Sequence, residues 1–287
     1  MKYDTLPKAL YNHLGVKKIL YQNDSCILYK RLTESVLEQE KISTSHCIVF
    51  VIKGKVEVKT FDGQCVTAHE DEMLFMPRDT YLISDLTKNK ECIEVFLVFF
   101  DHDIVVKFLG SKITQHHKPS VSTSTICKLE TSTKISHYFT ALKEIYFDFE
   151  NDKDILEYKI LEFLHLVYIN NHSEIIDTLN SSENQKKKRN IETLMLNNFD
   201  KNLTVADFAN LSGRSLSTFN RDFKSKYGQT PRQWLIKKKM EKAEELLTDG
   251  INVTTCAIEV GYSNISHFIK AYKLIYGKTP NSIKKTL

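Results

Sequence analysis

The chain has 287 residues, of which 41% are hydrophobic and 26% are charged. This balance, with 9 Gly and 5 Pro, excludes a collagen-like repeat and a wholly disordered chain. The length favours two domains over one. No run approaches the roughly 18 apolar residues that a membrane span needs, and the first residues lack the apolar core of a secretory signal. We therefore expect a cytoplasmic protein that has no membrane partner.

The net charge of +4 is unevenly distributed along the chain. Residues 181–287 contain 19 Lys and Arg against 10 Asp and Glu, a net charge of +9, whereas residues 1–180 contain 21 against 26, a net charge of −5. This asymmetry predicts a basic module that binds a polyanion, joined to a mildly acidic domain. The 6 cysteines are scattered without a C-x-x-C pair, so we expect reduced thiols.

The first hundred residues have the patterns of strands. An apolar run at 49–52 is followed by a glycine turn and by alternating apolar and charged residues over 55–59. Asp62-Gly63 predicts a hairpin, and the apolar runs 73–76 and 93–100 predict two further strands. Short strands at this spacing predict a small antiparallel barrel or sandwich. We assign residues 1–105 to this domain.

After residue 105 the apolar spacing becomes helical. Ile135, Phe139 and Leu142 recur at helical intervals, and a second helix over 155–168 is apolar around most of its circumference. A helix of that kind either packs on its own barrel or forms an oligomer interface. We expect residues 106–179 to be a helical segment packed on the barrel.

A polar stretch at 180–190 separates these helices from the basic module at 191–287. It has no apolar anchors and contains four consecutive cations at 186–189, so we interpret it as a linker. The four cations are either solvated or form an auxiliary contact to phosphates.

The basic module contains an internal repeat. The pattern of aromatic, glycine and proline residues in 219–231 reappears 49 residues later in 268–280. Upstream the offset is 48, and it pairs Gly213 with Gly261. Chance agreement at one offset is improbable, so the module contains two copies of one structural unit.

Each copy has the features of a helix-turn-helix. In the first, Thr204 and Asp207 predict the start of a helix, Gly213 predicts its end, and a second helix is expected near Ser215. The residues expected to face the core are Leu216, Phe219 and Phe223 in the first copy, and Ile265, Phe268 and Tyr272 in the second.

Other side chains at the start and along the second helix of each copy are expected to face outward, and they are hydroxyls, amides, cations and one histidine. Such groups contact base edges and phosphates from the major groove of DNA. The candidate DNA-binding residues are Ser215, Ser217, Thr218, Asn220, Arg221 and Lys224 in the first copy, and Ser263, Asn264, Ser266, His267, Lys270 and Lys273 in the second. A capping box at 230–233 predicts a helix that joins the copies, so that one chain reads two successive groove segments.

Residues from about 190 to 284 resemble the DNA-binding module of the AraC/XylS family of bacterial transcription regulators. The resemblance covers both helix-turn-helix units, and its motif residues include Leu203, Phe208, Ala209, Gly213, Phe219, Pro231, Ala243, Leu247, Ala257, Gly261, Phe268 and Pro280. The sequence departs from the family at Lys237–Lys239, where members usually carry Arg, and at Cys256.

The first two-thirds are similar to the cupin-like sensor domain of this family, in its ExsA-type branch of secretion activators. Residues 72–78 and the helix around 159–164 carry the similarity, although Asp71 and Asp79 replace expected glycines. The resemblance implies an α+β protein whose sensor domain dimerises and receives regulatory proteins. It places the candidate dimer interface at Ile160, Leu161, Leu164 and Tyr168.

We therefore expect a sequence-specific transcription regulator that binds double-stranded DNA as a homodimer. The expected mode is activation, with RNA polymerase as a partner, under control of a small ligand or a regulatory protein at the N-terminal domain. The alternative is a cupin-type metalloenzyme with a DNA anchor. His46 and His69 are isolated rather than paired as H-x-H, and His116-His117 lies in a polar stretch. With no P-loop, H-E-x-x-H or G-x-S-x-G motif, we expect no catalytic residue, metal or cofactor.

Overall fold

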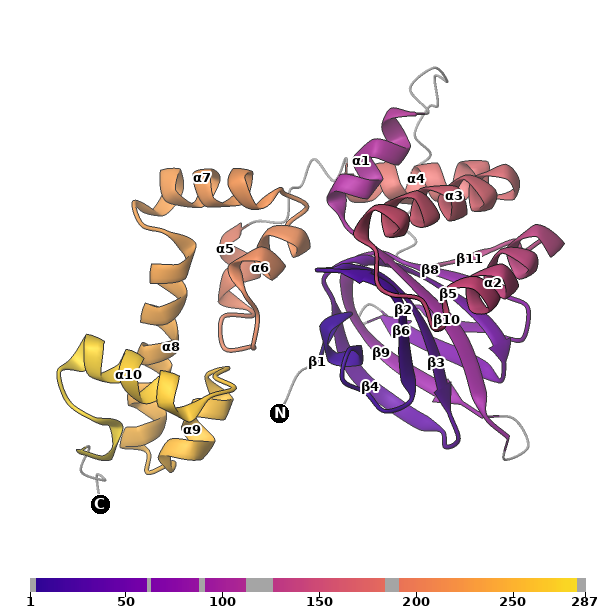
Figure 1. Cartoon of the computed structure of the whole chain (residues 1–287). Helices are drawn as coiled ribbons and strands as arrows, with labels where there is room; N and C mark the ends of the chain where they lie inside the picture. The colour runs from indigo at the N-terminus through magenta and orange to yellow at the C-terminus, as the bar shows by residue number, and fades with distance from the viewer. Residues whose placement is uncertain (1–3, 61–62, 88–90, 112–125, 184–190, 283–287) are drawn as a thin grey trace. The chain divides into compact units, whose positions relative to one another are not determined.

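The computed structural model describes residues 4–60, 63–87, 91–111, 126–183 and 191–282, with the side chains of 180–183 excepted. The chain divides into two compact units, one formed by Asp4–Lys186 and the other containing Lys187–Leu287. The first unit holds two β-sheets and several helices, and the described part of the second is helical (Figure 1). The predicted mixed α+β fold class is confirmed.

The first unit has two sheets. The strands are β1 (Asp4–Leu6), β2 (Val16–Gln22), β3 (Ser25–Leu32), β4 (Val36–Ser43), β5 (His46–Lys53), β6 (Lys55–Thr60), β7 (Cys65–Ala68), β8 (Met73–Met76), β9 (Asp79–Leu86), β10 (Ile93–Phe100) and β11 (Cys127–Leu129). One sheet has the order β1-β4-β9-β6-β7 and the other has the order β11-β8-β5-β10-β3-β2. Pairing is antiparallel except between β1 and β4. The described strands thus form a sandwich-like pair of sheets, and their pairings do not close a barrel.

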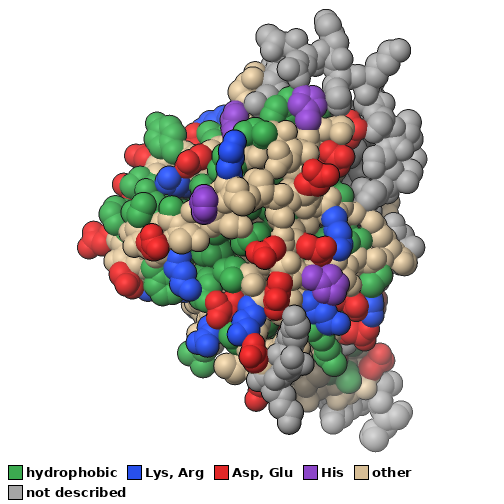
Figure 2. Space-filling model, turned by 90° about the vertical axis from the view of Figure 1, so that its right-hand side faces the viewer, with side chains coloured by type: hydrophobic (Ala, Val, Ile, Leu, Met, Phe, Trp, Pro, Cys, Tyr) green, Lys and Arg blue, Asp and Glu red, His purple; other side chains and the backbone are tan. Residues whose placement is uncertain are grey.

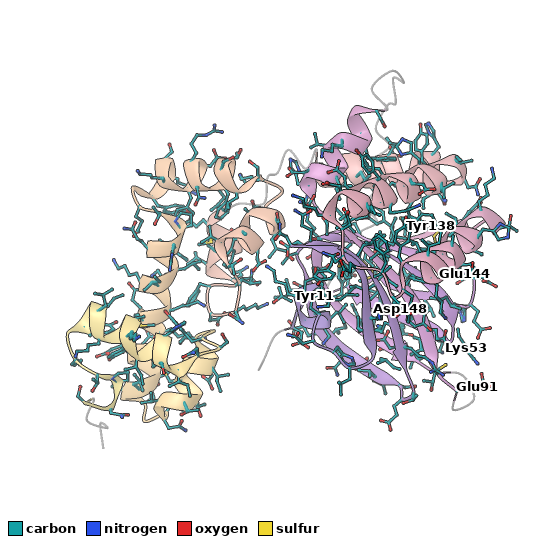
Figure 3. The ribbon with its side chains drawn as sticks, in the orientation of Figure 1. Tyr11, Lys53, Glu91, Tyr138, Glu144 and Asp148 are labelled. Atoms are coloured by element: carbon teal, nitrogen blue, oxygen red, sulfur yellow. The ribbon has the colours of Figure 1, made fainter. Side chains whose placement is uncertain are left out.

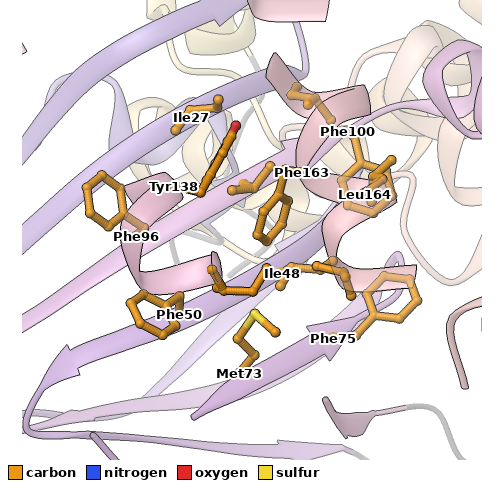
Figure 4. Packing of buried hydrophobic residues seen from close by; sticks show 14 of the residues in the cluster. Ile27, Ile48, Phe50, Met73, Phe75, Phe96, Phe100, Tyr138, Phe163 and Leu164 are labelled. Atoms are coloured by element: carbon orange, nitrogen blue, oxygen red, sulfur yellow. The ribbon is translucent and has the colours of Figure 1, made fainter. Parts of the chain in front are cut away.

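The long apolar run of β10 is explained by burial on both faces. Phe96 and Phe100 belong to a core that also contains residues of two helices, α2 (Thr133–Tyr146) and α3 (Lys153–Asn170). Leu97 and Phe99 belong to a second core, shared with Val56 of the other sheet. Figure 4 shows the helix-covered core with Phe96 and Phe100. The Phe96 ring stacks on that of Phe139, a residue of α2, with centroids 4.6 Å apart. The central strand is therefore apolar at successive positions because both of its faces are buried.

Four helices follow the strands: α1 (His102–Gly110), α2 (Thr133–Tyr146), α3 (Lys153–Asn170) and α4 (His172–Glu183). Tyr138 of α2, labelled in Figure 3, is buried. Its hydroxyl donates a hydrogen bond to the carbonyl of Lys159 on α3 (2.7 Å). Because α4 continues to Glu183, the first four residues of the predicted linker are helical. The other linker residues at 184–190, including the four cations, lie outside the described residues.

The placement of α3 corrects the predicted dimer interface. Ile160 and Leu164 are completely buried in the core beneath α3, so they cannot contact a partner. Leu161 and Tyr168 are partly buried against the same core. The apolar circumference of this helix is explained mainly by packing within its own unit.

The second unit contains α5 (Ile191–Leu196), α6 (Val205–Leu211), α7 (Leu216–Tyr227), α8 (Pro231–Thr248), α9 (Val253–Glu259) and α10 (Ile265–Tyr276), followed by the 3-10 turn η2 (Pro280–Ser282). The pairs α6–α7 and α9–α10 are the two copies of the repeat. A core around α8 includes Met240, Ala243, Phe268 and Tyr272.

Candidate nucleic-acid interface

The first helix-turn-helix is held by the caps that the sequence predicts. The Thr204 hydroxyl accepts a hydrogen bond from the Asp207 amide, and the Asp207 carboxylate accepts one from the Thr204 amide (2.7 Å). This reciprocal capping box satisfies amides that the start of α6 would otherwise leave unpaired. Gly213 follows α6 with a φ of 71°, a left-handed conformation that glycine adopts without steric cost.

The second helix-turn-helix repeats this construction. Asn252 caps α9 by accepting a hydrogen bond from the Thr255 amide (2.9 Å), and Gly261 turns the chain with a φ of 77°. A Cβ atom at Gly261 would lie 2.4 Å from the Asp200 carbonyl oxygen and 2.6 Å from that of Lys201. Glycine is therefore required here both by conformation and by the close approach of the chain before α6.

Helix α7 buries one side and exposes the other. Phe219 and Phe223 are fully buried, as predicted, whereas Leu216 is 48% exposed, so its predicted place in the core is wrong. The exposed side carries four of the candidate DNA-binding residues, Ser217, Asn220, Arg221 and Lys224.

Ser215 and Thr218 have a structural role. Ser215 is the N-cap of α7, where its hydroxyl accepts a hydrogen bond from the Thr218 amide (3.3 Å) and donates one to the Thr218 hydroxyl (2.9 Å). Asn264 occupies the equivalent position in the second copy. Its side-chain oxygen accepts hydrogen bonds from the amides of Ser266 (2.8 Å) and His267 (3.2 Å).

Helix α10 is arranged like α7, with one side buried and the other exposed. Phe268 and Tyr272 are fully buried, as predicted, but Ile265 is 38% exposed and does not anchor the core. The other candidate residues of this copy, Ser263, Ser266, His267, Lys270 and Lys273, are exposed, as is Asn264.

Several cations of these helices are available to a polyanion. In the described part of the chain, no carboxylate lies within ion-pair distance of Lys224, Lys270 or Lys273. Lys226 differs, because its ammonium pairs with Glu192 at 3.0 Å. By contrast, the face drawn in Figure 2 mixes basic with acidic side chains.

Lys239 was not identified as special by sequence reasoning. It lies on α8 in the same row as Leu235 and Ala243, is only 8% exposed, and donates hydrogen bonds to the carbonyls of Lys201 (3.2 Å) and Gly261 (3.1 Å). These carbonyls belong to the chain before α6 and to the turn of the second copy. Burial lowers the pKa of Lys239 from 10.5 to about 8. One side chain of the connecting helix therefore ties both copies together.

The histidines considered for a metal site are separated in the structure. His46 is fully buried beside the rings of Phe75 and Phe100, and burial, followed by the nearby Arg78 and His102, lowers its pKa well below 6.5. His69 is exposed. His116-His117 lies outside the described residues. Within the described ranges, no three His, Cys, Asp or Glu side chains are grouped so that they could hold a metal ion.

None of the described helices combines sufficient length with sufficient apolar character to cross a bilayer.

Two helix-turn-helix units that each expose polar and cationic side chains define the class of a DNA-binding transcription regulator. Residues 208–286 match the family described as a helix-turn-helix domain, and residues 46–178 match the ExsA N-terminal regulatory domain. The chain belongs to the AraC family of transcription regulators, with an ExsA-type N-terminal regulatory domain. This is a family of regulators rather than of enzymes.

Curated relatives align with most of the chain. It is 23% identical to the thermoregulatory protein LcrF of Yersinia pestis, over 83% of this chain and 89% of that protein. It is 22% identical to the HTH-type transcriptional regulator ExsA of Pseudomonas aeruginosa, over 84% of this chain and 86% of that one. It is also 22% identical to the virulence regulon transcriptional activator VirF of Yersinia enterocolitica, over 83% and 89% respectively.

Proposed function

We propose that this regulator is a sequence-specific activator that reads two successive major-groove segments with α7 and α10. The observation that carries the proposal is the equivalence of these helices, which have matching buried aromatics and matching exposed cations at Lys224 and Lys273. The 18 residues of α8 correspond to a helix about 27 Å long, comparable with the roughly 34 Å between groove segments on one face of DNA. Activation, and with it RNA polymerase as a partner, is supported by the name of VirF.

We assign two kinds of contact to the exposed residues. Ser217, Asn220, Arg221, His267 and Lys270 are the proposed base-edge contacts. Lys224 and Lys273 are the proposed phosphate contacts, since they are exposed, occupy equivalent positions in the two copies and have no carboxylate within ion-pair distance among the described residues. Ser215, Thr218 and Asn264 then contribute by fixing the first turns of the two helices.

A pair of variants tests this division. Asn220→Ala should cost about 1–3 kcal/mol of binding free energy and relax selectivity at one base pair. Lys224→Ala should weaken binding to all sequences alike and reduce the dependence on salt. Binding titrations against an operator and its single-base variants, at two salt concentrations, separate the two effects. If both variants bind every DNA as the wild type does, this docking is wrong.

A cavity in the first unit supports control by a small ligand. It measures about 250 Å³, and its walls are mainly apolar side chains such as Leu6, Val49, Val56, Leu97 and Phe99. Two ion pairs also line it, Lys30–Asp85 (2.6 Å) and Lys41–Asp4 (2.5 Å). Because each cation already has a carboxylate partner, we infer a largely apolar ligand without net charge.

Mass spectrometry of small molecules released from the denatured, purified chain tests this control. The matched variant is Val36→Trp, which places a bulky side chain at the cavity wall. A stoichiometric molecule that the wild type releases and the variant does not would support a ligand. If neither protein releases a molecule and the variant is still regulated, control by a regulatory protein would be favoured over control by a small ligand.

We further propose that the chain forms a homodimer through the outer face of α3. Tyr158 and Ile169, three turns apart on that face, are 72% and 60% exposed, and Leu161 between them is partly exposed. Sedimentation of the wild type should show a dimer, and Tyr158→Lys with Ile169→Lys should yield the monomer. A wild type that stays monomeric at all concentrations contradicts the proposal.

A further inference from the structure

Each recognition helix begins with an exposed aliphatic side chain. Leu216 is the first residue of α7 and Ile265 the first of α10, immediately after the N-caps Ser215 and Asn264. They correspond to each other at the 49-residue offset of the repeat. With exposures of 48% and 38%, neither residue is needed to fill the core.

The repetition separates this pair from other surface hydrophobes. Single exposed aliphatic residues are ordinary on protein surfaces. Leu274, for example, is 86% exposed near the end of α10, but its counterpart in α7 is Ser225. Among the described residues of the second unit, Leu216 and Ile265 are the only large exposed hydrophobes found at equivalent positions in both copies.

Leu216 lies in one row with proposed DNA contacts. Residues four apart are neighbours on a helix surface, so Leu216 is followed on the same face by Asn220 and then by Lys224. In a helix-turn-helix the N-terminal residues of the second helix contact base edges. In the major groove, the C5-methyl group of thymine is the apolar feature that such a residue can contact.

We propose that Leu216 and Ile265 each read the methyl group of one thymine, so that each DNA box contains a thymine recognised by an apolar contact. The inference rests on the proposed function, because it requires both helices to enter the major groove. Leu216 and Ile265 would then contribute to the choice of DNA sequence, although neither is among the polar and cationic candidate contacts.

Replacing thymine by uracil removes only the methyl group and tests the inference directly. The DNA is the operator obtained by genomic selection with the full-length chain, substituted at one thymine at a time. Wild-type protein should lose roughly three- to fivefold in affinity at one thymine per box, as expected for one buried methyl group. Leu216→Ala should bind thymine and uracil equally in one box while staying sensitive in the other, and Ile265→Ala should show the reverse.

Leu274→Ala is the matched control, since it shortens a more exposed aliphatic residue of α10 and should behave as wild type. Circular dichroism checks that the variants are folded, which their exposed positions favour. Wild-type affinity that is unaffected by uracil at every position, or variants that keep both sensitivities, would overturn the inference and leave the proposed function intact. Failure of the wild type to select any operator would overturn both.

Discussion

The buried ammonium of Lys239 should make the second unit more stable as the pH rises from 8 to 10.5. Its folded-state pKa is about 8, against 10.5 without burial. Between these values the unfolded chain binds a proton that the folded chain has released, so a rise in pH favours folding. At about 1.4 kcal/mol per pKa unit, the gain over this range is about 3 kcal/mol. The neutral amine retains two N–H donors for the carbonyls of Lys201 and Gly261.

Lys239→Met isolates this contribution, because methionine keeps an unbranched apolar side chain without a titratable group. The single tryptophan, Trp234, is buried on the same helix, so its fluorescence during urea denaturation reports unfolding of this unit. The free energy of unfolding of wild type, relative to the variant, should rise by about 3 kcal/mol between pH 8 and 10.5. Lys237→Met, at an exposed position of α8, should follow the wild type. Parallel profiles for wild type and Lys239→Met would refute the reasoning.

Two further predictions concern buried or tightly packed positions. In the first unit, the His46 pKa lies well below 6.5, so the unfolded chain takes up the proton first and stability should fall as the pH drops through 6.5. His46→Phe should remove this acid sensitivity in thermal unfolding monitored by circular dichroism, and an unchanged pH profile would contradict the assignment. Gly261→Ala should destabilise the second unit by more than about 2 kcal/mol, because the new Cβ meets two backbone oxygens. Gly277→Ala, with a similar φ and open space, should cost only about 1 kcal/mol, and equal losses in urea titrations would argue against the close contact.

The parts of the fold that the sequence predicts are those with strong local signals. The apolar runs 73–76 and 93–100 coincide with β8 and β10, and the capping box predicted at 230–233 forms at the start of α8. Thr204 is the N-cap of α6, as predicted. The early strands were less evident. β4, for example, alternates irregularly because a register shift interrupts its pairing with β9 between Val36 and Gln39.

The candidate site shows a similar division. The buried aromatics of α7 and α10 follow from helical spacing, but the same spacing wrongly placed Leu216 and Ile265 in the core. The first turn of each helix extends beyond the core, and periodicity alone does not show where a core ends. The charge of Lys239 also gave no indication that this residue is buried. A lysine normally indicates a solvated face, and only its position in an apolar row with Leu235 and Ala243 could have revealed its burial.

The most direct test of the central claim is selection of genomic DNA fragments by the full-length chain and by residues 181–287, at two salt concentrations. Sequence-specific reading by α7 and α10 predicts one shared motif, with two short boxes about one helical turn apart, recovered at both salt concentrations. If residues 181–287 select this motif and the full-length chain does not, the N-terminal unit inhibits DNA binding. Binding that disappears at the higher salt concentration and yields no motif would contradict it, because it would reduce the second unit to a non-specific polyanion anchor.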